Sequence, residues 1–156
     1  MADLPVVVLS VAGYVRPRKE RKPCPVCSSR VENLDSTYCS NACQMEAQYK
    51  AYVQAWKAGE ISGTKSGGVC LSNHVRRYLL ETRGEKCSEC GWSERNPVTG
   101  KVPVTVNHKD GDWRRSSEDN LEVLCPNCHS LTPTYGNLNK GRGRPHRPIR
   151  CGALSQ

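Results

Sequence analysis

The chain has 156 residues and is only 37% hydrophobic, with 13 glycines, ten prolines and no phenylalanine. This composition excludes a large continuous apolar core, and no apolar run is long enough to span a membrane, so something besides hydrophobic burial has to hold the fold together. The N-terminus lacks the basic start and unbroken apolar run of a secretory signal, and we therefore expect a cytoplasmic protein.

The formal net charge of +8 is concentrated at the two ends of the chain. A basic N-terminal arm is expected over residues 1–23 and a basic C-terminal tail over 140–156, both with little to pack. Such arms are either solvated tails or contacts to a phosphate backbone, and the motif described below favours the second interpretation. The candidate nucleic-acid-binding residues are Arg16, Arg18, Lys19, Arg21, Lys22, Lys140, Arg142, Arg144 and Arg147.

The first module, residues 24–58, is expected to be a zinc finger followed by a helix. Eight of the ten cysteines fall into four close pairs, which in a reducing compartment indicate zinc more often than disulfides. Apolar and aromatic residues recur at three- and four-residue steps over 44–57, which predicts a helix with one packed face. A Gly-rich linker is expected over 59–69. The ligands of this first structural zinc would be Cys24, Cys27, Cys39 and Cys43.

The second module, residues 70–139, is expected to hold a helix over 73–83, ended by Gly84. Alternating valines over 102–106 and the apolar run 121–124 then predict two strands of a hairpin, followed by a helix that starts at a proline. Two Cys-x-x-Cys turns that converge on one ion form a closed, structural site. Cys70 and His74 could also bind a metal from one helix face, but this pair is isolated. The ligands of the second structural zinc would be Cys87, Cys90, Cys125 and Cys128.

Within this module the chain reads VNHKDGD, then DNL, then CPNCH. The order and spacing of His108, Asn120 and His129 in these segments resemble the HNH endonuclease family, and in particular free-standing, homing-type bacteriophage proteins with zinc-binding Cys pairs. The resemblance covers about residues 70–140. It implies a small α+β fold of the zinc-stapled ββα-metal kind, which is treble-clef-like, with an N-terminal zinc finger and basic terminal arms.

The resemblance also implies the roles of the motif residues. His108 would be the general base that activates water, Asn120 would brace the loop, and His129 with Asn107 would hold one divalent ion, Mg²⁺ or Mn²⁺. The substrate would be duplex DNA, nicked or cut on both strands to leave a 5′-phosphate and a 3′-hydroxyl. No membrane or small-molecule partner is expected. The location would be the host cytoplasm if a phage encodes the chain, and the oligomeric state is left open.

Asn107 departs from the family pattern, which usually has Asp before the catalytic His. A carboxamide oxygen can bind a hard cation but brings no negative charge, so the ion would be held less tightly. Asp110 or Asp112 is expected to supply the missing carboxylate, directly or through water. On this hypothesis Asn107→Asp lowers the metal concentration that cleavage needs.

Two other functions stay open at this point. Asn107 favours a zinc-dependent DNA-binding protein with weak or no catalysis. The resemblance to phage proteins also allows an HNH component of a DNA-packaging machine. Cleavage of supercoiled plasmid that disappears with chelator and with His108→Ala would distinguish an enzyme from a binding module.

Overall fold

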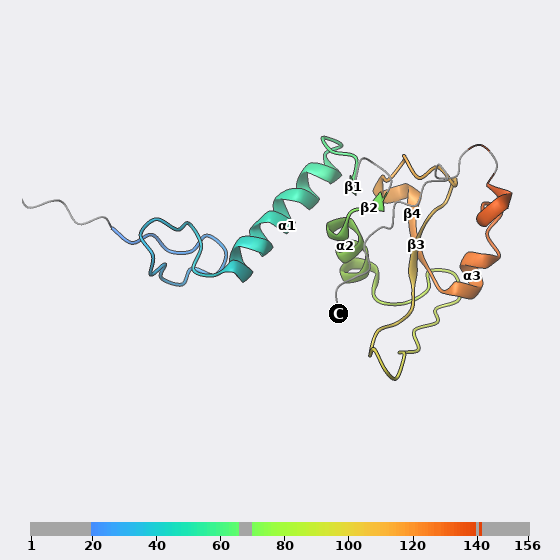
Figure 1. Cartoon of the computed structure of the whole chain (residues 1–156), viewed down its shortest axis with the longest axis horizontal. Coiled ribbons are helices and arrows are strands. Elements are labelled where there is room, and N and C mark those ends of the chain that lie inside the picture. Colours follow the sequence, from blue (N-terminus) through green and yellow to red (C-terminus); the bar gives the residue numbers. More distant parts are fainter. Residues whose placement is uncertain (1–19, 66–69, 140, 142–156) are drawn as a thin grey trace, which may run out of the picture. The chain divides into compact units, whose positions relative to one another are not determined.

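The computed structural model describes residues 20–65, 70–139 and 141 as a small α+β protein (Figure 1). The chain divides into two units, residues 1–45 and 46–156, which are described separately. In the described part, none of the helices combines the length and apolar character that crossing a membrane needs. The elements in chain order are α1 Asn41–Lys57, β1 Thr64–Lys65, β2 Cys70–Leu71, α2 Asn73–Arg83, β3 Thr105–His108, η1 Glu118–Asn120, β4 Leu121–Leu124, α3 Pro126–Ser130 and η2 Gly136–Leu138.

The first unit is built around a tight turn that carries its first two cysteines. The Cys24 carbonyl accepts a hydrogen bond from the Ser28 N–H, and the Cys24 N–H donates to the Ser29 carbonyl, both at 2.8 Å. Ser28 adopts a left-handed conformation with φ 61°, which closes the turn. The side chain of Ser40 accepts a hydrogen bond from the backbone N–H of Cys43, so Ser40 caps the start of α1.

The core of the second unit joins three segments that lie far apart in sequence. Trp56 of α1 packs with Val75 and Leu79 of α2 and with apolar residues of the hairpin. Two arginines of α2 reinforce this packing: Arg76 donates to the Val104 carbonyl at 2.9 Å, and Arg83 donates to the carbonyls of Glu118 and Leu121. The buried members of the core are Trp56, Val75, Leu79, Val102, Val104, Leu121 and Val123.

The helix predicted over 73–83 is confirmed with the same bounds. The Ser72 side chain accepts a hydrogen bond from the His74 N–H at its start, and Gly84 ends it with φ 80°. An N-cap hydroxyl marks the start of a helix and a glycine at positive φ marks its end, so sequence alone could locate both ends.

The β3–β4 hairpin is antiparallel and pairs His108 with Leu121 and Asn107 with Glu122. The return strand 121–124 is confirmed, whereas the first strand begins later than predicted, at Thr105. The cause is a tight turn in which the Val104 N–H bonds to the Val102 carbonyl at 2.8 Å, so these valines enter the core without pairing to another strand. α2 packs against β4, and α3 packs against both strands (Figure 1).

Part of the segment expected to be a flexible linker, 59–69, is ordered. Thr64–Lys65 forms β1, which pairs with β2, and Gly63 accepts a backbone hydrogen bond from Ser72 at 2.9 Å. Gly63 has φ 72°, and a Cβ there would lie 2.6 Å from the Trp56 indole nitrogen. The glycine is therefore needed for a close approach, a role that composition alone does not distinguish from flexibility.

Candidate functional site

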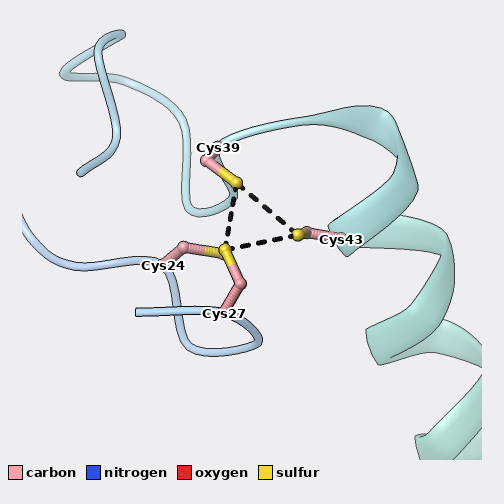
Figure 2. Close-up of side chains that lie close together, drawn as sticks. All are labelled: Cys24, Cys27, Cys39 and Cys43. Atoms are coloured by element: carbon pink, nitrogen blue, oxygen red, sulfur yellow. Dashed lines mark hydrogen bonds between the residues drawn. The ribbon is translucent and has the colours of Figure 1, made fainter. Parts of the chain in front are cut away.

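The four cysteines of the first unit form one compact cluster. Figure 2 shows the Cys39 and Cys43 sulfurs directed toward the turn that carries Cys24 and Cys27. The Cys27, Cys39 and Cys43 sulfurs are 3.4 to 3.6 Å apart, and all four ligand atoms lie within 4.8 Å of one another. Four sulfurs at this spacing can surround one tetrahedral ion, so the cluster fits a structural zinc site.

Backbone hydrogen bonding prepares this first cluster for a cation. The backbone N–H of Cys39 lowers the pKa of the Cys24 thiol to about 6. Hydrogen bonds with the sulfurs of Cys27 and Cys43, together with burial, raise the pKa of Cys39 to about 12. A divalent ion binds thiolates and not thiols, so metal binding here would release protons.

The second four-cysteine cluster joins the turn after α2 to the start of α3. Cys125 is the N-cap of α3 and Pro126 is its first residue, as predicted, and the Cys125 sulfur accepts a hydrogen bond from the Cys128 N–H. All four ligand atoms again lie within 4.8 Å of one another. Burial raises the pKa of Cys87, but backbone N–H groups of Cys90 and Cys125 outweigh it and lower the pKa to about 6. This cluster therefore also fits zinc and ties α3 to the Cys87–Cys90 turn.

Cys70 and His74 do not form a further metal site. Cys70 is buried in β2 and is 2% exposed. The His74 ring instead packs against Tyr52 and Tyr49, with ring centroids 4.8 and 5.9 Å apart. Its role in the structure is packing between α1 and α2.

His108 lies at the end of β3 and is only 8% exposed. Its Nε2 is 3.0 Å from the hydroxyl of Ser116, which is itself buried. The carbonyl of Ser116 accepts a 2.7 Å hydrogen bond from Trp56. The imidazole is therefore oriented by a residue whose own position depends on α1.

Asn120 holds the loop that connects β3 to β4. Its amide nitrogen donates to the Arg115 carbonyl at 2.6 Å and to the Asp110 carboxylate at 2.9 Å, while its oxygen accepts from the Asp110 N–H. Burial raises the pKa of Asp110, but hydrogen bonds from Asn120 and the Asp112 N–H, together with Arg115, outweigh it, and the pKa is lowered. Asn120 and Asp110 thus brace each other across the loop.

Asn107 precedes His108 in β3 and is almost as buried, at 9% exposure. Its amide nitrogen donates to the Glu122 carboxylate at 2.8 Å. His129 lies in α3, which packs against β3 and β4, and its ring meets Tyr135 edge-on with centroids 5.2 Å apart. The structure brings Asn107 and Glu122 into direct contact. His129 belongs to α3, the helix that packs on the same hairpin.

Ser116 and Glu122 contact the motif residues His108 and Asn107, and the sequence motif does not predict either contact. Glu122 could have been found by aligning the two strands outward from the loop, since Asn107 and Glu122 are then opposite each other. No local signal marks Ser116, because its contacts with His108 and Trp56 are both formed by folding.

Two of the nine candidate nucleic-acid-binding residues lie in the described part. Arg21 forms an ion pair with Glu32, and Lys22 is exposed. The others, Arg16, Arg18, Lys19, Lys140, Arg142, Arg144 and Arg147, lie outside the described residues.

Comparisons with known proteins agree with the motif. The chain is 43% identical over 103 residues to the H-N-H endonuclease F-TflIV of Escherichia phage T5, which is 64% of this chain and 40% of that protein. The resemblance to HNH endonucleases is thereby confirmed. The Zorya protein ZorE of Escherichia coli is 27% identical over 92 residues, 59% of this chain and 24% of that protein. The chain thus spans less than half the length of each of these two relatives. Neither a family model nor a solved structure matches it.

Proposed function

We propose that the chain is a metal-dependent HNH endonuclease that hydrolyses phosphodiester bonds in duplex DNA. The observation that carries the proposal is the 43% identity to a phage H-N-H endonuclease, in a chain that holds the ordered set His108, Asn120 and His129. The β3–β4 hairpin, followed by α3 and tied by a four-cysteine cluster, supports a ββα-metal fold for this part.

His108 acts as the general base in this proposal. A buried imidazole hydrogen-bonded to Ser116 is restricted in orientation, which favours proton transfer from a water on one side of the ring. Asn120 is a positioning residue, supported by its three hydrogen bonds within the loop.

Asn107 and His129 are the proposed ligands of the catalytic ion, Mg²⁺ or Mn²⁺. The chemistry of the donors supports this assignment. The amide nitrogen of Asn107 donates to Glu122, so the amide oxygen, a suitable ligand for a hard cation, is turned away from Glu122. A bound ion would supply electrostatic stabilisation at the scissile phosphate. Zinc at the two four-cysteine clusters is structural, because four thiolates leave no open position.

The proposed organisation follows the sequence interpretation, with residues 24–58 as a finger and 70–139 as the nuclease domain. The two basic arms would contact the phosphate backbone of DNA and contribute affinity without sequence readout.

Incubation of the zinc-loaded protein with supercoiled plasmid and Mg²⁺ or Mn²⁺ tests the proposal. We expect nicked or linear product that disappears with EDTA and with His108→Ala. His74→Ala is the matched control, since His74 is a half-buried imidazole that packs against tyrosines, and this variant should still cleave. Cleavage that persists in His108→Ala would refute the assignment of the base.

A DNA-binding protein without catalysis is the second candidate, and Asn107 is the observation that favours it. A carboxamide in place of a carboxylate weakens the hold on a divalent ion. DNA binding in a gel-shift experiment, without cleavage in any divalent metal, would establish this alternative.

A further inference from the structure

The acidic side chain next to Asn107 is Glu122. The two residues are Cα partners in the β3–β4 pair, so their side chains extend from the same face of the hairpin. The Asn107 amide nitrogen donates to Glu122 Oε1 at 2.8 Å. Because a carboxylate can only accept hydrogen bonds, this contact also determines that the nitrogen of the amide, and not its oxygen, faces Glu122.

The acids in the loop after β3 are engaged elsewhere. One Asp110 oxygen accepts from Asn120 and from the Asp112 N–H, and the other accepts from Arg115 at 2.6 Å. Asp112 accepts from the Arg114 N–H and forms an ion pair with the same residue. Both carboxylates are therefore partly neutralised by arginines and used to shape the loop.

Glu122 differs from these acids in its surroundings. Within the described part of the chain its hydrogen-bond partner is a neutral amide, and none of the ion pairs there includes it. Its side chain is half-buried, where charge is screened less than on an open surface. No ion pair in the described ranges 20–65, 70–139 and 141 therefore offsets its negative charge.

We propose that Glu122 supplies, through Asn107, the negative charge that holds the divalent ion. This inference rests on the proposed function and names the residue that compensates for the missing aspartate. An aspartate at 107 opposite a neutral residue and an asparagine opposite a glutamate carry the same total charge. In the second arrangement the Glu122 charge polarises the Asn107 amide, so that the amide oxygen becomes a stronger ligand. The Glu122 carboxylate also attracts the ion directly, but from the paired strand and so over a longer distance.

A titration of the zinc-loaded chain with Mn²⁺ in the absence of DNA tests the inference apart from catalysis. The EPR signal of the free ion measures how much Mn²⁺ remains unbound. Glu122→Gln keeps an oxygen that accepts from Asn107 but removes the charge, and we expect binding about 10- to 100-fold weaker. Glu94→Gln, the same change at an exposed glutamate outside the β3–β4 pair, is the matched control and should bind as the unsubstituted chain does.

A second variant keeps the test decisive if Glu122→Gln disturbs the hairpin. Asn107→Asp combined with Glu122→Gln moves the carboxylate from one strand to the other, and we expect it to restore Mn²⁺ affinity to at least the original level. The double variant is used because Asn107→Asp by itself would place two carboxylates opposite each other, and these would repel. His129→Ala is the reference for loss of the site.

The outcomes separate the inference from the proposed function. Unchanged affinity in Glu122→Gln, no recovery in the double variant, or no Mn²⁺ bound by the unsubstituted chain would each overturn the inference. If plasmid is still cleaved in a His108-dependent manner in these cases, the nuclease function survives. Glu122-dependent Mn²⁺ binding without any cleavage would support the inference and overturn the nuclease function.

Discussion

The indole nitrogen of Trp56 donates a 2.7 Å hydrogen bond to the carbonyl of Ser116, a residue 60 positions further along the chain. The hydroxyl of the same serine lies 3.0 Å from Nε2 of His108. Trp56 is 5% exposed and belongs to the core that also holds α2 and the hairpin. The position of the proposed general base therefore depends on a tryptophan in α1.

Trp56→Phe should reduce both stability and turnover. The substitution keeps most of the apolar surface but leaves the buried Ser116 carbonyl without its donor, at a cost of about 1–3 kcal/mol. Urea unfolding measures the loss of stability, and single-turnover cleavage with a DNA-binding titration should show a lower rate at unchanged affinity. Trp92→Phe is the control, because Trp92 packs beside the core and its indole donates no hydrogen bond in the described part. Equal losses of rate in the two variants would refute the role of the bond.

Gly111→Ala should be more harmful than Gly100→Ala. Both glycines have positive φ, 72° and 66°, so either alanine costs about 1–2 kcal/mol in backbone strain. A Cβ at 111 would also lie 2.7 Å from Asn139 Oδ1 and 2.8 Å from a Thr134 methyl, whereas nothing lies within 4 Å at 100. We expect an additional 1–3 kcal/mol, about the cost of overpacking, and slower cleavage in Gly111→Ala alone. Similar thermal stabilities would contradict this.

Removal of each zinc should have separate consequences. Cys39 belongs to the cluster of the first unit and Cys128 to that of the second, so Cys39→Ser and Cys128→Ser should each lower the zinc content from two ions to one. Cys128→Ser should also abolish cleavage, since the second cluster ties α3 to the Cys87–Cys90 turn, while Cys39→Ser should preserve the hairpin and the nuclease. Zinc is measured by mass spectrometry of the metal, and loss of both ions in either variant would show that the clusters depend on each other.

Alkaline pH should destabilise the chain through Tyr49. Burial, with a 2.5 Å hydrogen bond to Glu81, raises the pKa of Tyr49 from 10.0 to about 12. A raised pKa means that the stabilisation is complete below pH 10 and is lost as the pH rises through 12, on the order of 2–3 kcal/mol. Urea unfolding of the native chain and of Tyr49→Phe from pH 8 to pH 11.5 should converge as the pH rises. Parallel curves would contradict the assignment.

Much of the second unit was predictable from local signals. The ends of α2 follow from Ser72 and Gly84, and the start of α3 follows from Pro126, because caps and proline act within a single turn. The first strand was predicted too early, since the alternation of Val102 and Val104 reports burial and not strand pairing. Part of the segment expected to be a linker forms β1. Composition did not predict this, because a glycine needed for close packing cannot be distinguished by composition from one that permits flexibility.

The sequence by itself determined which residues are proposed to carry chemistry: two sets of four cysteines and the ordered residues His108, Asn120 and His129. Spacing was sufficient there because ligand type and motif order are properties of the chain. Only the tertiary structure decided their partners, Ser116 at His108 and Glu122 at Asn107, and the part of α1 in holding Ser116. These hydrogen bonds depend on strand register and on packing between distant segments, and no local pattern along the chain encodes either. The proposed compensation for the missing aspartate, the Glu122 carboxylate opposite Asn107, therefore follows from the strand register alone.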